Sequence, residues 1–227
     1  MAKLVWDETG TKSFETGVRK GVLYKKNKTQ GTYPSGVAWN GLTAVTESPG
    51  GADVTDLYAD DIKYASYRAV ETFGGTIEAY QCPVEFEECD GTAAPKTGVA
   101  IGQQSRAPFG FCYQTQVGND IDQEAGYKLH LIYGATVSPS EKAYQTINES
   151  PDIGTFSWEF STTPENVTGY KPTSVITINS LTANATALAA LETILYGSEQ
   201  TEPRLPLPDE VISIMTPSGT TGATGAG

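Results

Sequence analysis

Apolar and polar residues alternate along most of the chain, as in β-strands whose side chains point to opposite faces. The clearest run is TFSWEFST, which places Phe156, Trp158 and Phe160 on one face. The other runs are VRKGVLYKK (18–26), VAWNGLTAV (37–45), IKYASY (62–67), FGGTIEAY (73–80), FGFCYQTQV (109–117), KLHLIYGATV (128–137) and TSVITINS (173–180). Turns rich in glycine, proline and asparagine separate them, so the pattern predicts about eight strands.

Three of these runs carry more specific predictions. VAWNGLTAV is expected to be one strand, with Val37, Trp39, Thr43 and Val45 on one face. FGFCYQTQV and KLHLIYGATV are joined by the turn-rich GNDIDQEAG, which predicts a hairpin.

Helical periodicity is confined to two places. TANATALAALETILYG predicts a helix at about 183–196, with a possible cap at Thr182, apolar residues at Leu188, Leu191 and Leu195, and a stop at Gly197. A short helical turn is expected from Pro83 to Cys89. The predicted fold is therefore mainly β: an antiparallel sandwich or barrel-like domain with one flanking helix and long loops.

The pattern predicts a single domain over residues 1–215, with a flexible N-terminal segment at 1–16. Residues 216–227, rich in glycine and threonine, offer nothing to bury and are expected to be a disordered tail. The opening residues do not resemble a signal peptide, and no stretch is long and apolar enough for a membrane span. We therefore expect synthesis in a cytosol and no membrane insertion.

Charge divides the chain unevenly. The net charge is −12, yet residues 1–35 carry seven basic and three acidic residues, a net +4, and the remainder carries −16. This split favours contact between unlike patches of neighbouring copies, and it disfavours a nucleic-acid binder that reads phosphates with its main surface.

Candidate chemistry is sparse. Cys82, Cys89 and Cys112 cannot all pair within one chain, so free thiols are expected. The only histidine, His130, is expected on a strand face beside Lys128, which is too little for a zinc set or a catalytic triad. We find no nucleophile elbow or phosphate loop, and we predict no catalytic residues, no cofactor and no metal site.

The acidic stretch between the second and third runs is the most unusual feature. Asp53, Asp56, Asp60 and Asp61 follow a Pro-Gly-Gly turn, but their spacing differs from that of a calcium-binding loop. A cation site is the sharper interpretation of this stretch, and a solvated acidic loop is the simpler one.

Several segments together resemble the major tail proteins of long-tailed bacteriophages and related prophages of Gram-positive bacteria. They are YPSGVAWNGLTAVTESPGG, LYADDIKY, TFGGTIEAYQCPVEFEECDG, YKLHLIYGATVSPSEKAYQTINESPDIGTFSWEFSTTP and ALAALETILYG, in order from about Gly17 to about Gly197. The resemblance implies a structural tail tube subunit: a β-sandwich that assembles into hexameric rings, which stack into a hollow tube for ejection of genomic double-stranded DNA. The implied partners are further copies of the chain and the tape measure, tail terminator and tail tip proteins, in the virion tail after assembly in the host cytoplasm.

In this family a long loop between early strands reaches the adjacent ring or subunit. The stretch from Thr46 to Asp61 matches that position, so Asp53, Asp56, Asp60 and Asp61 are expected as contact or rim carboxylates, with Leu57 and Tyr58 as an apolar anchor. The alternative is a carbohydrate- or cell-surface-binding β-sandwich of a phage tail, for which Trp39 and Trp158 are the candidate aromatic platforms.

Overall fold

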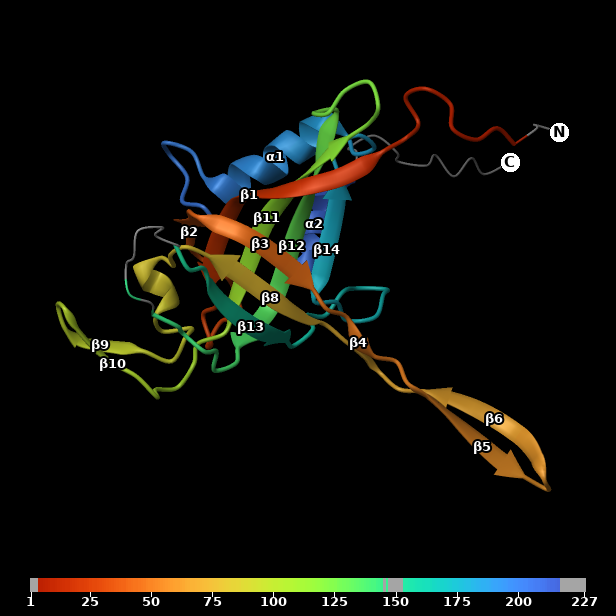
Figure 1. The fold of residues 1–227 in the computed structure, drawn as a ribbon, viewed down its shortest axis with the longest axis horizontal. Helices are drawn as coiled ribbons and strands as arrows, with labels where there is room; N and C mark the ends of the chain where they lie inside the picture. Colours follow the sequence, from red (N-terminus) through yellow and green to blue (C-terminus); the bar gives the residue numbers. More distant parts are fainter. Residues whose placement is uncertain (1–3, 145, 147–152, 217–227) are drawn as a thin grey trace, which may run out of the picture.

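A computed structural model describes residues 4–144, 146 and 153–216, and it is mainly antiparallel β-structure with two α-helices (Figure 1). The large sheet contains β1 (Phe14–Lys25), β2 (Gly36–Trp39), β3 (Leu42–Glu47), β8 (Gly74–Ala79), β11 (Phe109–Gly118), β12 (Gly126–Val137), β13 (Phe156–Thr162) and β14 (Val175–Asn179). Three small antiparallel pairs join β4 (Gly50–Gly51) to β7 (Glu71–Thr72), β5 (Val54–Ala59) to β6 (Ile62–Arg68), and β9 (Ala93–Lys96) to β10 (Val99–Ile101). The helical elements are η1 (Val84–Phe86), α1 (Ala185–Tyr196) and α2 (Pro208–Met215). The predicted β-sandwich class with a flanking helix is confirmed.

The eight-stranded sheet follows the order β2-β1-β11-β12-β13-β8-β3, and β14 also pairs with β12. Its end strands, β2 and β3, are consecutive in the sequence, and β1 lies against β3. The sheet therefore curls until its two ends meet, which gives the domain its barrel-like shape.

The long strand β12 changes partner along its length. Residues 128–132 pair with β14, and residues 135–137 pair with β13. Between them Gly134 has φ +61°, and a Cβ there would lie 2.1 Å from the carbonyl oxygen of Thr163. Only glycine fits this bend without a backbone shift, so one residue directs β12 from one layer into the other.

Two apolar cores lie on opposite sides of β11 and β12. Inside the curled sheet, Trp39, Phe86, Phe111 and Trp158 meet with ring centroids 4.5–5.6 Å apart. On the outer side, α1 and α2 cover the sheet with a second apolar cluster (Figure 1). Alternate side chains of β11 point into the two cores, Phe109, Phe111 and Tyr113 into the inner one and Cys112 into the outer one. The small and polar positions of this strand are therefore buried as well.

Helix α1 begins and ends for local reasons. The side chain of Asn184 accepts a hydrogen bond of 3.0 Å from the backbone N–H of Ala187, so the cap is Asn184, and the expected cap at Thr182 is wrong. The expected stop at Gly197 is confirmed, with φ +75°. Leu188, Leu191 and Leu195 are buried against the sheet, as their spacing predicts.

The prediction that VAWNGLTAV forms one strand is wrong. The run divides at Asn40 and Gly41, where Gly41 has φ +81°. The first half pairs with β1 and the second half pairs with β8, at the other end of the sheet. The period-2 alternation of apolar and polar residues continues across this corner at Asn40 and Gly41, so the alternation alone does not reveal that the run is divided.

Other boundaries were partly anticipated. The hairpin of β11 and β12 and the helical turn after Pro83 are confirmed. Strand β1 begins at Phe14, inside the segment expected to be flexible, and the sequence pattern did not reveal α2 or the β9–β10 hairpin. Of the expected disordered tail at 216–227, all but Thr216 lies outside the described residues. Within the described part of the chain, none of the helices has the length and apolar character needed to cross a bilayer.

Candidate functional site

A β-hairpin projects from the body of the protein, and we call residues 50–72 the arm (Figure 1). At its base, Gly50 and Gly51 pair with Thr72 and Glu71. A Cβ on Gly51 would lie 2.5 Å from the carbonyl oxygen of Val70, so the two chains approach closely at this point. Farther out, β5 and β6 form a two-stranded ribbon that reaches well beyond the large sheet.

The end of the arm is a two-residue turn made of Asp60 and Asp61, which we call the tip. Their φ angles are +51° and +61°, the left-handed values that a type I′ hairpin turn requires at both positions. Asparagine and glycine are favoured there, and aspartate tolerates the conformation because its short polar side chain can bond locally. The tip therefore presents two exposed carboxylates at the end of the arm.

The two faces of the arm differ in character. Paired residues of an antiparallel ribbon share a face, so the register assigns each side chain of β5 and β6 except Tyr64, which lies at a register shift. One face is mostly apolar and is formed by Thr55, Leu57, Ala59, Ile62, Ala65 and Tyr67. On the other face Lys63 Nζ lies 2.8 Å from Asp56 Oδ1, and the Ser66 hydroxyl donates to the same oxygen over 2.7 Å. These two contacts, with Lys63 the larger effect, lower the pKa of Asp56 below its ordinary value.

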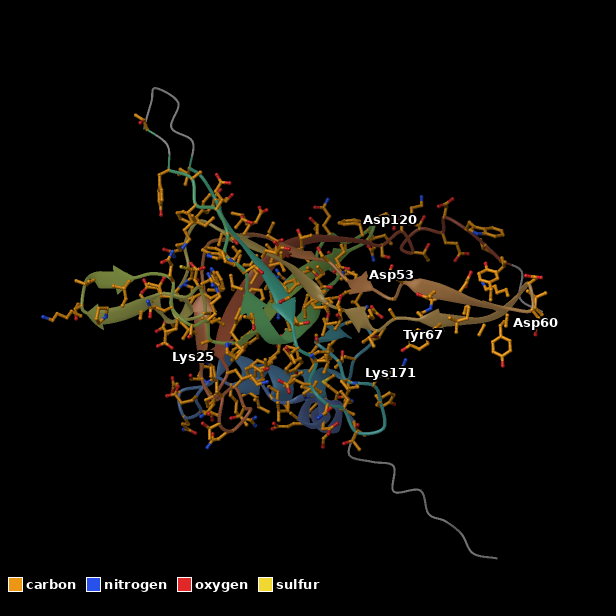
Figure 2. The ribbon with its side chains drawn as sticks, turned by 90° about the horizontal axis from the view of Figure 1, so that it is seen from below. Lys25, Asp53, Asp60, Tyr67, Asp120 and Lys171 are labelled. Atoms are coloured by element: carbon orange, nitrogen blue, oxygen red, sulfur yellow. The ribbon has the colours of Figure 1, made fainter. Side chains whose placement is uncertain are left out.

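The six predicted contact residues all lie on the arm, but they do not form one cluster. Figure 2 shows Asp53 near the body and Asp60 at the far end, with Tyr67 on the opposite strand. Leu57 is 50% exposed and Tyr58 is 69% exposed. Across the described residues, no group of three or more His, Cys, Asp or Glu side chains is placed to hold a metal ion.

The expectation that residues 46–61 form a loop is wrong. They include β4 and β5, and the acidic stretch belongs to a regular hairpin with IKYASY as its second strand. The apolar residues of that second strand were also missed as contact candidates, although Ile62, Tyr64 and Tyr67 are each at least 65% exposed. The signal that could have found them is the alternation of IKYASY opposite a strand with its own apolar positions.

A polar cluster occupies the seam where β1 faces β3, in a cleft of about 410 Å³. His130 is 8% exposed and its ring stacks on Tyr113, with centroids 4.6 Å apart. Its Nδ1 lies 3.3 Å from Glu47 Oε1, and its Nε2 lies 3.6 Å from Glu15 Oε1. The imidazole therefore bridges a carboxylate on β1 and a carboxylate on β3, two strands that contact each other at the seam.

The close approach of the His130 ring, and then the hydrogen bond from Tyr113, keep the pKa of Glu47 below its ordinary value, against the opposing effect of burial. His130 was expected on a strand face beside Lys128, and both side chains do contact Glu15. The expectation left out its burial and its bridging position, because Glu15 and Glu47 are far from it in the sequence.

The three cysteines are free thiols, as expected. Burial raises the pKa of Cys89 to about 12 and that of Cys112 to about 12. Both thiols are therefore protonated and weakly reactive at neutral pH.

Neither known protein families nor curated proteins give a match to this chain.

Proposed function

We propose that this chain is a structural subunit that assembles into stacked rings, forming the hollow tail tube of a long-tailed bacteriophage. The observation that carries the proposal is the arm: a two-stranded ribbon with an apolar face, extended away from the body. A two-stranded hairpin in water is marginally stable at best, and an exposed apolar surface of this kind is typical of an interaction site. The arm gains its stability by docking on another copy.

An arm that projects from one copy can engage a different surface on the next copy. A contact between an arm and a different surface of the next copy is heterologous, and repetition of such a contact produces a ring or an open filament. The short end strand β2 offers further backbone groups for pairing between copies within a ring. Both kinds of contact are needed for a tube made of rings.

The acidic excess of the chain is compatible with a conduit for DNA, because a basic lumen would bind phosphates and retain the genome. In this proposal the DNA passes without specific binding, and the ends of the tube meet tape measure, tail terminator and tail tip proteins. The protein acts without turnover and uses no cofactor.

Burial of the two candidate platforms, Trp39 and Trp158, counts against the alternative, a carbohydrate-binding module. Trp39 is 2% exposed and Trp158 is 1% exposed, and both rings pack inside the curled sheet. Neither can serve as a platform on which a sugar stacks.

Negative-stain electron microscopy of the purified protein, paired with light scattering over a range of concentrations, tests the proposal. We expect six-membered rings or hollow tubes above a threshold concentration. A chain that stays monomeric over the whole range, including in the presence of sheared tubes from a preparation of tails, would overturn it.

A further inference from the structure

A groove of about 560 Å³ lies beside the edge of the large sheet. Residues 18–22 of β1 form its floor, β2 and the corner at 40–42 form one wall, and the end of α1 with Pro203 forms the other. Most of the side chains that line it are apolar, and Ala38, Leu42 and Tyr196 retain exposed surface there. It is thus a half-open apolar groove on the body of the domain.

Two cations line this groove, Arg19 and Lys20, and both are exposed. Among the described residues that line it, none is acidic. A guanidinium N–H of Arg19 makes a long hydrogen bond of 3.4 Å to Gln116, and the ammonium of Lys20 lies 5.5 Å from the centroid of the Tyr196 ring. Neither cation forms an ion pair within the part of the chain that the structure describes.

The carboxylate of Glu192, on α1 beside Tyr196, already has partners. Gln114 and Tyr127 each donate a hydrogen bond of 2.9 Å to it. The groove therefore combines apolar walls with two positive charges that are free to meet an outside anion.

The groove lies on the body, well away from the tip. In Figure 1, β2 and the end of α1 are on the side of the body away from the β5–β6 ribbon. One chain cannot place its own tip in its own groove, so any contact between them joins two copies, and a contact that repeats in one direction builds a ring or a filament.

We propose that the tip of the arm docks in the groove of the next copy. This inference rests on the proposed function, and it adds the receptor for the arm. Asp60 and Asp61 lie beside Arg19 and Lys20, while Tyr58 contacts the apolar wall. The two carboxylates of the tip and the two cations of the groove attract each other, and this attraction fixes the orientation of the contact. A groove lined by acidic side chains would instead repel the tip.

A second cleft, of about 480 Å³, provides a matched comparison. Lys25, Lys26 and Lys28 line it, but Lys25 is paired with Glu88 and Lys26 with Glu165. Acidic partners within the same chain therefore offset most of its positive charge, which makes it the weaker receptor for an acidic tip.

The contact is tested first on the unaltered protein. A carbodiimide joins a carboxylate to an amine only when the two are in direct contact. We expect assembled protein to yield a cross-linked peptide pair that contains Lys20 and either Asp60 or Asp61. A mixture of isotopically heavy and light chains should yield mixed pairs, because the contact is between copies.

Variants provide the second measurement. The double variant Arg19→Glu, Lys20→Glu should raise the threshold concentration for assembly about tenfold or more, because it places like charges at the contact. The control Lys28→Glu should leave the threshold within about twofold, and thermal unfolding should show that both variants are folded.

The outcomes separate the two proposals. Tubes that form without this cross-link, and that form equally well from the Arg19→Glu, Lys20→Glu chain, would overturn the groove as receptor and leave the tube function standing. Protein that neither assembles nor cross-links at high concentration would overturn both.

Discussion

Removal of the apolar side chains of the arm should separate assembly from folding. In the variant Leu57→Ala, Tyr58→Ala, the altered side chains are 50% and 69% exposed and lie on opposite faces of the ribbon. The change should therefore lower the free energy of unfolding by no more than about 0.5 kcal/mol, the usual effect of a surface substitution.

The expected effect on assembly is much larger. Full burial of a leucine contributes about 1.5–3 kcal/mol, so covering the exposed half of Leu57 is worth about 1 kcal/mol. A buried aromatic side chain covers about 150–250 Å², so the exposed two thirds of Tyr58 are worth about 3 kcal/mol at about 25 cal/mol per Å². Docking recovers only part of this sum, and we expect the arm contact to weaken at least about a hundredfold.

The assay is the threshold concentration for tubes by light scattering and electron microscopy, with urea unfolding on the same samples. A matched control is Leu181→Ala, Tyr170→Ala, which removes side chains that are 54% and 76% exposed on the body and should assemble normally. The positive control for unfolding is Leu191→Ala, a fully buried side chain whose loss should cost about 2–5 kcal/mol. Tubes from the arm variant at the normal threshold would refute the reasoning, and so would a loss of more than about 1 kcal/mol in its unfolding.

Three further predictions concern the body. Gly134→Ala should destabilise the fold by about 2 kcal/mol or more, because the new Cβ meets the Thr163 carbonyl at positive φ; a urea midpoint close to that of the unaltered chain would contradict this. Asn184→Ala should cost about 1 kcal/mol by loss of the helix cap, whereas Asn184→Ser should cost less, and circular dichroism during urea unfolding compares them. The pKa of Glu47 is lowered in the folded state, chiefly by His130, so the stabilisation from its carboxylate is complete above the unfolded pKa of about 4.5 and is lost as the pH falls through the folded pKa. The variant Glu47→Gln should therefore show a smaller loss of stability between about pH 5 and pH 3 than the unaltered chain. An identical dependence of unfolding free energy on pH in the two chains would disprove this prediction.

Strands and helix α1 could be predicted from the sequence because their signals are local. Phe156, Trp158 and Phe160 alternate with polar neighbours, and this alternation alone indicates which face of β13 is buried. Three leucines at helical spacing do the same for α1. Local periodicity, however, carries no information about which strand pairs with which, so the corner that separates β2 from β3 was missed.

The sequence indicated where the arm lies in the chain, but it did not reveal that the arm is a regular β-hairpin. A turn made of Asp60 and Asp61 lacks the Asn-Gly signature of a tight hairpin, and the acidic residues around it resemble an ordinary polar loop. The groove and the seam cannot be found from sequence patterns at all. The groove combines residues from Val18 to Pro203, and the seam brings Glu15 and Glu47 to His130 from three strands.

The order of the strands also determines when each part of the protein becomes available during synthesis. The arm is local, since β5 and β6 are joined by a two-residue turn, and a hairpin of this kind forms within about 1–10 μs. In contrast, β1 needs β11, about ninety residues later, and the groove needs the end of α1 and Pro203. Ribosomes add about 5–20 residues per second, so the residues of the arm are made several seconds before the last residues of the groove. In the docking that we propose, an unfinished chain has no complete groove and cannot accept the next subunit, so continued growth of a tube requires completed chains.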